Sequence, residues 1–390
     1  MLEHPLSTYY LLLGSTLLLL ALGVVMVMSA SAIESFRIFG SAYTIAQRQG
    51  MFALMGVVLM LAATRLPVRF YRRLAWPALI VSGVLLVLVL IPGIGVEVAG
   101  QRNWIDTVGP FRLQPSEFAK FALVLWSADL LARKSALLDR WSHLLVPVLP
   151  VGGLFMGLVL LEGDFGNSLM LAVILCGILF AAGAPLRLFA LLGAVGLAGV
   201  ALLSVTASYR MDRFRAWLDP SADRLDAAWQ LTQGQYALGT GGWWGVGLGA
   251  SREKWGDLPE AHTDFIFPVI GEELGLIGTL VVLALFAGLA FACFRLARSS
   301  VDRFVQLASA GVGSWIVVQA VVNIGAVLGL LPITGVPIPL VSYGGSSLIL
   351  TLAALGMVMA FARQEPAARA ALDRRHRGRR RAEPAARARR

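Results

Sequence analysis

The chain is short of charge, cysteine and histidine, and each shortage argues against a class of protein. Only 14% of its 390 residues are charged, whereas about a quarter of the residues of a soluble domain are. Cys176 and Cys293 lie in apolar stretches without C-x-x-C spacing, which argues against a disulfide framework, thiol chemistry or a cysteine metal site. The four histidines are too scattered to indicate a metal site, and no internal repeat indicates an inverted-repeat transporter.

Long apolar runs dominate what is present. Hydrophobic residues make up 57% of the chain and its mean hydropathy is +0.75. A helix needs roughly 20 mostly apolar residues to cross a bilayer. Such runs occur at residues 9–30, 51–66, 75–95, 116–133, 144–161, 167–184, 187–207, 265–294, 304–331 and 346–362. The sequence therefore predicts an all-α integral membrane protein of about ten transmembrane helices.

The first run has no basic segment before it and is too long for the core of a cleavable signal peptide, so it is predicted to be the first span. The eighth and ninth runs are long enough to tilt or to contain a break. Basic residues gather in alternate loops, which predicts that both termini are cytoplasmic. These loop residues are Arg65, Arg69, Arg72, Arg73, Arg133, Lys134, Arg140, Arg187, Arg295, Arg298 and Arg303.

The apolar runs predict a membrane domain over residues 1–363, and the basic segment after them predicts a cytoplasmic tail over residues 364–390. Within the domain, residues 208–263 form a large extracytoplasmic loop between the seventh and eighth spans. From Arg363 onward the chain has eleven arginines and three carboxylates. So basic a segment is expected to be disordered and to lie near anionic headgroups. It lacks the aromatic residues that stack on bases, so we predict no nucleic-acid partner.

The densest polar cluster, Leu258–Phe267, stands where this loop enters the eighth span, and it contains Asp264. A carboxylate at a helix N-terminus is favoured in its ionised form, in which it can act as a general base or hold a divalent cation. Thr263 or Asp264 would serve equally well as a helix cap. Position alone leaves both interpretations open.

Charges inside the predicted spans form a second group of candidates. Glu117 and Lys120 lie three residues apart on one face of the fourth span. They are predicted either to form a structural ion pair or to contact the substrate. Glu272 and Glu273 in the eighth span also need partners, either another helix or a water-filled cavity.

Three loop segments carry further signals. Arg210, Arg213 and Arg215 have side chains that suit either diphosphate oxygens or lipid headgroups. The glycine-rich run 239–249 lacks the flanking strand and lysine of a nucleotide loop, so a flexible or re-entrant loop is the better interpretation. The run 331–345 has three prolines, which predicts a structured loop capping a cavity.

These segments together resemble the SEDS family, and they occur in that family's order over residues 20–363. The matching blocks are Arg102–Ile105, Gln114–Lys120, Tyr209–Arg210 to Leu218–Pro220, Gly245–Gly249, Pro259–Asp264, Asn323, Pro332–Gly335 and Ser342–Gly345. The run Lys254–Asp264 is more similar to the FtsW branch than to the RodA branch. The sequence departs from the family pattern at Gly163, Gly234 and Pro268.

The resemblance implies an inverting glycosyltransferase that polymerises lipid II at the outer face of the cytoplasmic membrane, at the division septum. It implies Asp264 as the catalytic residue and places Trp104 and His262 in the substrate site. Arg210, Arg213 or Lys254, or a Mg or Mn ion held partly by Asp264, would then stabilise the leaving diphosphate. The implied partners are a class B penicillin-binding protein and other division proteins. The alternatives are a lipid II flippase, a RodA-like elongation polymerase and a noncatalytic scaffold.

Overall fold

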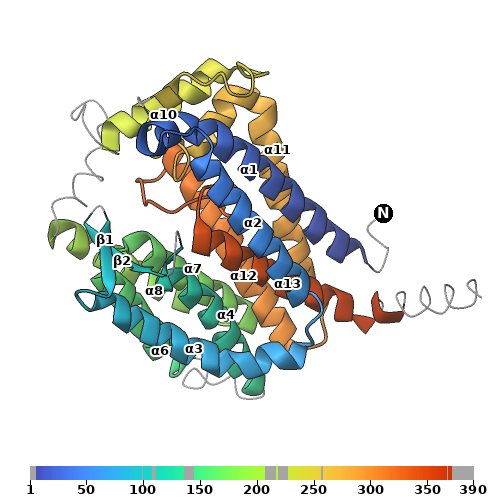
Figure 1. Ribbon diagram of the computed structural model, residues 1–390. Coiled ribbons are helices and arrows are strands. Elements are labelled where there is room, and N and C mark those ends of the chain that lie inside the picture. Colours follow the sequence, from blue (N-terminus) through green and yellow to red (C-terminus); the bar gives the residue numbers. More distant parts are fainter. Residues whose placement is uncertain are drawn as a thin grey trace, which may run out of the picture.

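The computed structural model describes residues 6–98, 100–107, 111–135, 145–206, 217, 227–255, 258–366 and 368–370, and nearly all of its regular structure is helical (Figure 1). The helices are α1 (Ser7–Phe39), α2 (Thr44–Ala63), α3 (Val68–Leu90), α4 (Pro115–Arg133), α6 (Val148–Leu161), α7 (Phe165–Ala182), α8 (Leu186–Thr206), α10 (Ala227–Gly241), α11 (Ile266–Ser299), α12 (Arg303–Val327) and α13 (Gly345–Gln364). Each predicted span overlaps one of these helices, although several ends differ by five residues or more, and α10 lies within the predicted extracytoplasmic loop. The predicted helical architecture is confirmed.

Seven of the helices in the described residues are long and apolar enough to cross a membrane. The helix α6 and the first part of α8 are apolar but shorter. The helix α4 carries Glu117, Lys120, Asp129 and Arg133, which lower its hydropathy although most of its residues are buried. The number of crossings therefore stays a prediction.

The core is formed where α4, α7, α12 and α13 pack together, with α1, α2 and α3 outside them (Figure 1). The helix α2 packs along α13, and α1 packs along α11. Gly356 permits the first of these contacts, because a Cβ atom there would lie 2.5 Å from the carbonyl oxygen of Met60. The Ser7 end of α1 and the Gln364 end of α13 lie on the same side of the molecule (Figure 1).

A small antiparallel sheet follows α3, and the sequence did not predict it. Its strands are β1 (Gly95–Val98), β2 (Gln101–Asp106) and β3 (Arg112–Leu113), in the order β1-β2-β3. Trp104 of β2 pairs with Val96 of β1. The sheet lies between α3 and α4 in the chain, and it packs against both helices.

The long helix α11 is broken at Gly275, whose φ of 67° and ψ of −168° are not helical. The glycine-rich segment fills the break: the backbone N–H of Val246 donates to the carbonyl of Glu272 (2.9 Å), and that of Leu276 donates to the carbonyl of Gly242 (2.9 Å). The broken helix thus has its backbone groups satisfied by protein, as a bilayer requires. Of the two alternatives for the eighth run, a tilt or a break, the structure shows a break. The helix α12 ends at Val327, so the ninth span is shorter than predicted.

Candidate functional site

Asp264 stands at the boundary between loop and helix, two residues before α11 begins. Its side chain is partly exposed, whereas residues 265–273 are all buried. Phe265 holds the N-cap position of α11, so neither Thr263 nor Asp264 occupies it. The hydroxyl of Thr263 donates instead to the Glu260 carboxylate, at 2.5 Å. Because the residues that follow it are buried, the backbone at Asp264 is anchored, while its side chain reaches the protein surface.

The backbone around Asp264 is held from two sides. The side-chain amide of Asn323 in α12 donates to the carbonyl of Asp264 and to that of Val336, each at 2.8 Å. The N–H of Tyr343 donates to the carbonyl of His262 at 2.9 Å. Asn323 of α12 and Tyr343 of the 331–344 segment therefore fix the Asp264 turn on its two flanks. The segment is ordered against the turn, as predicted, whereas its capping of a cavity stays a prediction.

His262 itself is buried and lies between two other elements. Its Nδ1 atom is 3.2 Å from a carboxylate oxygen of Glu34 near the end of α1, an ion-pair distance without hydrogen-bond geometry. Its ring lies 5.5 Å from that of Tyr343, between centroids. His262 thus joins α1 to the Asp264 turn.

A buried polar network runs through the core on α4, α7 and α12. The Lys120 ammonium donates to Glu117 (2.7 Å), Asn167 (3.0 Å) and Gln319 (3.3 Å). The side chains of Lys120 and Glu117 are 0% and 1% exposed. Gln319 donates in turn to the carbonyl of Pro337, in the loop that flanks Asp264. This arrangement matches the ion-pair alternative for Glu117 and Lys120, shared with neighbouring helices.

At its other end the network reaches Asp164, the N-cap of α7. The Asp164 carboxylate accepts hydrogen bonds from the backbone N–H of Asn167 and from the side-chain amides of Asn167, Gln114 and Asn103. Asn103 is on β2, so the small sheet is tied to the core of the helical bundle. Glu162, also buried, lies beside this cluster, and its carboxylate has no hydrogen-bond partner among the described residues.

The carboxylates of Glu272 and Glu273 are paired across the break in α11. Ser251 donates to Glu272 at 2.5 Å, and the hydroxyl of Ser29 in α1 donates to Glu273 at 2.6 Å. The Lys254 ammonium lies 3.0 Å from Glu273, with both side chains largely buried. Lys254 is thus neutralised by an internal carboxylate, and Glu272 bonds to protein groups rather than facing a cavity.

The remaining predicted site residues are not gathered at one point. Trp104 is half-buried on β2, on the small sheet, whereas Asp264 precedes α11. Arg210 and Arg213 lie outside the described residues. Within the described part of the chain, no group of three or more His, Cys, Asp or Glu side chains is placed to hold a metal ion.

Sequence reasoning gave Asn323, Asn167, Gln319, Gln114 and Asp164 no site role. Each is a polar residue within or beside a predicted apolar span, and that placement was the available signal. Their spacing along the chain did not reveal which of them meet, since they come from α12, α7 and the segments before α4 and α7.

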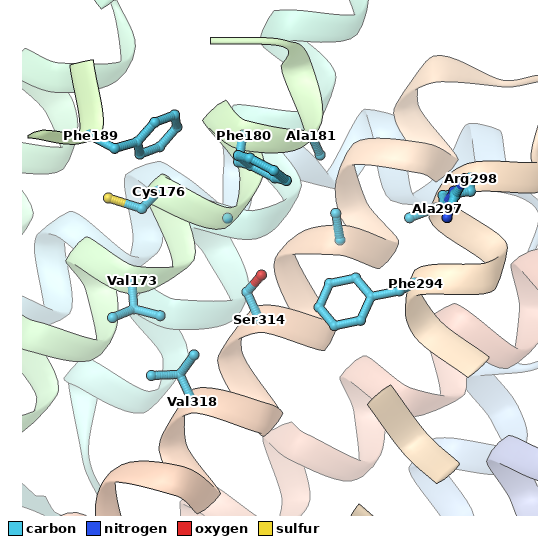
Figure 2. Close-up of a pocket in the computed structure, with 12 residues that line it drawn as sticks. Val173, Cys176, Phe180, Ala181, Phe189, Phe294, Ala297, Arg298, Ser314 and Val318 are labelled. Carbon is cyan, nitrogen blue, oxygen red and sulfur yellow. The ribbon is translucent and has the colours of Figure 1, made fainter. Parts of the chain in front are cut away.

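A largely apolar cavity of about 620 Å³ lies between α7, α8, α11 and α12 (Figure 2). Phe294 and Arg298 line it near the end of α11, whereas Asp264 precedes that helix. The cavity is also lined by Val318 of α12, five residues, or about 7.5 Å of helix, from Asn323, which bonds to the Asp264 backbone. Asp264 is not among the residues that line the cavity, which extends from Val318 to the Arg298 end of α11.

Comparison with known proteins agrees with this architecture. Residues 9–367 match the model of the cell cycle protein family that covers FtsW, RodA and SpoVE. A protein of Mycobacterium tuberculosis named as a probable peptidoglycan glycosyltransferase FtsW is 42% identical over 371 residues, which cover 95% of this chain and 71% of the relative.

Two solved structures are similar over most of their length. A chain from a peptidoglycan synthase complex, described as coordinating polymerisation and crosslinking, has a TM-score of 0.73 and 31% identity, covering 90% of this chain and 96% of that one. The rod shape determining protein RodA of Thermus thermophilus has a TM-score of 0.68 and 30% identity, covering 92% of this chain and 97% of that one. The chain therefore belongs to the cell cycle protein family of FtsW, RodA and SpoVE.

Proposed function

We propose that this protein is a division-type peptidoglycan glycosyltransferase that polymerises lipid II at the outer face of the cytoplasmic membrane. The observation that carries the proposal is the position of Asp264, a partly exposed carboxylate on a turn held by Asn323, directly before the buried start of α11. The names of the relatives and of the synthase complex supply the reaction class.

Asp264 is the proposed general base. It would take the proton from the sugar 4-hydroxyl of the acceptor, whose oxygen then attacks the anomeric carbon of the donor with inversion. The bond from that carbon to the lipid diphosphate breaks, and the diphosphate leaves with the electron pair. General-base catalysis of this kind contributes about 10²–10⁴-fold.

Positive charge is needed where the diphosphate leaves. Arg210 and Arg213 are the proposed cations, since Lys254 already pairs with Glu273. A Mg or Mn ion is compatible with Asp264, because carboxylate oxygen is a ligand that these hard cations accept. Its other ligands would come from substrate oxygens and water, as no further carboxylate or histidine cluster joins Asp264 among the described residues. The ion would supply charge for the departing diphosphate.

The chain is expected to work with a class B penicillin-binding protein, because the similar solved chain comes from a complex that couples polymerisation to crosslinking. Division proteins at the septum are the expected further partners, and the cytoplasmic membrane is the expected location. The buried Glu117–Lys120 pair, with partners on α7 and α12, supports a fixed structural role rather than a moving transport site.

The test is polymerisation of lipid II by purified protein with its cognate transpeptidase present, comparing wild type, Asp264→Asn and Glu260→Gln. Glu260 is the matched control, because it is an exposed carboxylate on the same turn. We expect glycan chains from wild type and Glu260→Gln, and at least a 100-fold lower rate from Asp264→Asn at equal thermal stability. Equal rates from wild type and Asp264→Asn would remove Asp264 as the base. No product from any variant, with lipid II transfer across vesicles instead, would favour the flippase.

A further inference from the structure

Two hollows meet at the Arg298 end of α11. The cavity of about 620 Å³ is bounded by α7, α8, α11 and α12 (Figure 2), and a second hollow of about 520 Å³ lies along α11 itself. Phe294 and Arg298 line both of them. The ring of Phe294 is partly exposed and stands where the two hollows adjoin. The result is one groove with two branches and a common basic residue.

The walls of the groove are suited to hydrocarbon. Phe180, Phe189 and Val318 are among the side chains that line the first hollow, with Ser314 as a lone hydroxyl at its centre (Figure 2). Volumes of about 300–1,000 Å³ are typical of small-molecule sites. Each branch is therefore large enough to bind a ligand segment.

The charge at the junction is positive. Among the described residues, Arg298 is the one charged side chain that lines the first hollow, and Arg295, which interacts with Glu365, joins it in the second. Within the described part of the chain the Arg298 guanidinium has no hydrogen bond or ion pair. A guanidinium suits phosphate oxygens because its donors form a planar fork. Both arginines belong to a predicted cytoplasmic loop, and the cytoplasmic leaflet is rich in anionic lipids.

We propose that an anionic diacyl phospholipid of the cytoplasmic leaflet binds in this groove. Its phosphate lies on Arg298, and one acyl chain occupies each hollow on either side of Phe294. A second protein's helix fits less well, since a helix 10–12 Å across needs one continuous face and Phe294 divides this one. The bound lipid would fill the space between α7 and α11, and this role is independent of glycosyl transfer.

Native mass spectrometry of the detergent-solubilised full chain tests the headgroup contact. The probes are palmitoyl-oleoyl phosphatidylglycerol and the corresponding phosphatidylcholine, titrated separately. We expect one phosphatidylglycerol to be retained in preference, and Arg298→Gln to weaken its binding about fivefold, the effect of one arginine near an anionic surface. The matched control is Arg65→Gln, an exposed arginine of another predicted cytoplasmic loop, which should leave binding unchanged. Equal retention of both lipids, or no effect of Arg298→Gln at unchanged thermal stability, would overturn the proposal.

The acyl-chain position has its own test in the wild-type protein. Cys176 lines the first hollow and is half-buried, whereas Cys293, the other cysteine of the chain, is buried. Phosphatidylglycerol should slow the labelling of Cys176 by a membrane-permeant maleimide several-fold, without a matching effect from phosphatidylcholine. Unchanged labelling would contradict occupancy of the hollow. Release of the lipid when the cognate transpeptidase is added would assign the groove to a partner helix and likewise overturn the proposal.

Discussion

The side-chain amide of Asn323 donates a hydrogen bond of 2.8 Å to the backbone carbonyl of Asp264. The same nitrogen donates to the carbonyl of Val336, so one buried side chain joins α12, the Asp264 turn and the loop before α13. Asn323 touches the backbone of Asp264 and not its carboxylate in these two bonds, which makes it a positioning residue. The geometry of the proposed base therefore depends on a residue 59 positions away in sequence.

Asn323→Ala should lower the polymerisation rate about 100-fold. Without the amide the Asp264 turn can shift, and a displacement of a catalytic group by about 1 Å lowers the rate by about this factor. The KM for lipid II should change much less than kcat, since the substrate-binding loops keep their sequence. Steady-state kinetics of glycan formation provide the measurement. Asn323→Gln, which keeps the amide donor, should recover part of the rate, and a KM effect alone would contradict a positioning role.

The ion pair of Glu117 and Lys120 should show strong coupling in a double-mutant cycle. Removing one partner leaves a buried charge, which costs about 3–5 kcal/mol. We therefore expect Lys120→Met and Glu117→Gln each to lower the thermal unfolding midpoint. The double variant should be more stable than the sum of the single effects predicts. Strict additivity would show that the two residues do not interact in the folded protein.

The break in α11 makes a prediction about Gly275. Its φ of 67° disfavours any side chain, and a Cβ atom there would lie 2.4 Å from the Gly245 nitrogen. Gly275→Ala should thus destabilise the protein by about 1–3 kcal/mol. The control is Gly153→Ala, in α6, where a Cβ atom would meet nothing within 4 Å. Thermal unfolding of both variants in the same detergent provides the comparison. Equal midpoints would show that the backbone at residue 275 accepts a side chain without loss of stability.

The helices could be predicted from the sequence, because apolar runs of this length have few alternatives in a bilayer. Asp264 and the pair of Glu117 and Lys120 could be singled out for a similar reason, as charges beside or inside such runs. The contact of Asn323 with Asp264 could not be predicted. It joins α12 to the turn before α11, and hydropathy does not show how these elements are rotated relative to each other. The small sheet was missed since its strands are only two to six residues long. The pairing of Lys254 with Glu273 was hidden as well, because it depends on how the 242–255 segment folds into the break of α11.

Glu162 should make the stability of the protein depend on pH. Burial, and secondarily the carboxylate of Asp164, raise the pKa of Glu162 from 4.5 to about 9 in the folded protein. The unfolded chain loses this proton near its ordinary pKa, whereas the folded protein retains it. The stabilisation is thus complete below about pH 4.5 and declines as the pH rises towards 9. Thermal unfolding midpoints measured at pH 5.5, 7.0 and 8.5 should fall in that order, after subtraction of the trend shown by Glu162→Gln, which cannot ionise. Glu97→Gln, at an exposed carboxylate of β1, should retain the wild-type trend. If the unfolding midpoint of Glu162→Gln changed with pH as that of the wild type does, another group would control the pH dependence of stability.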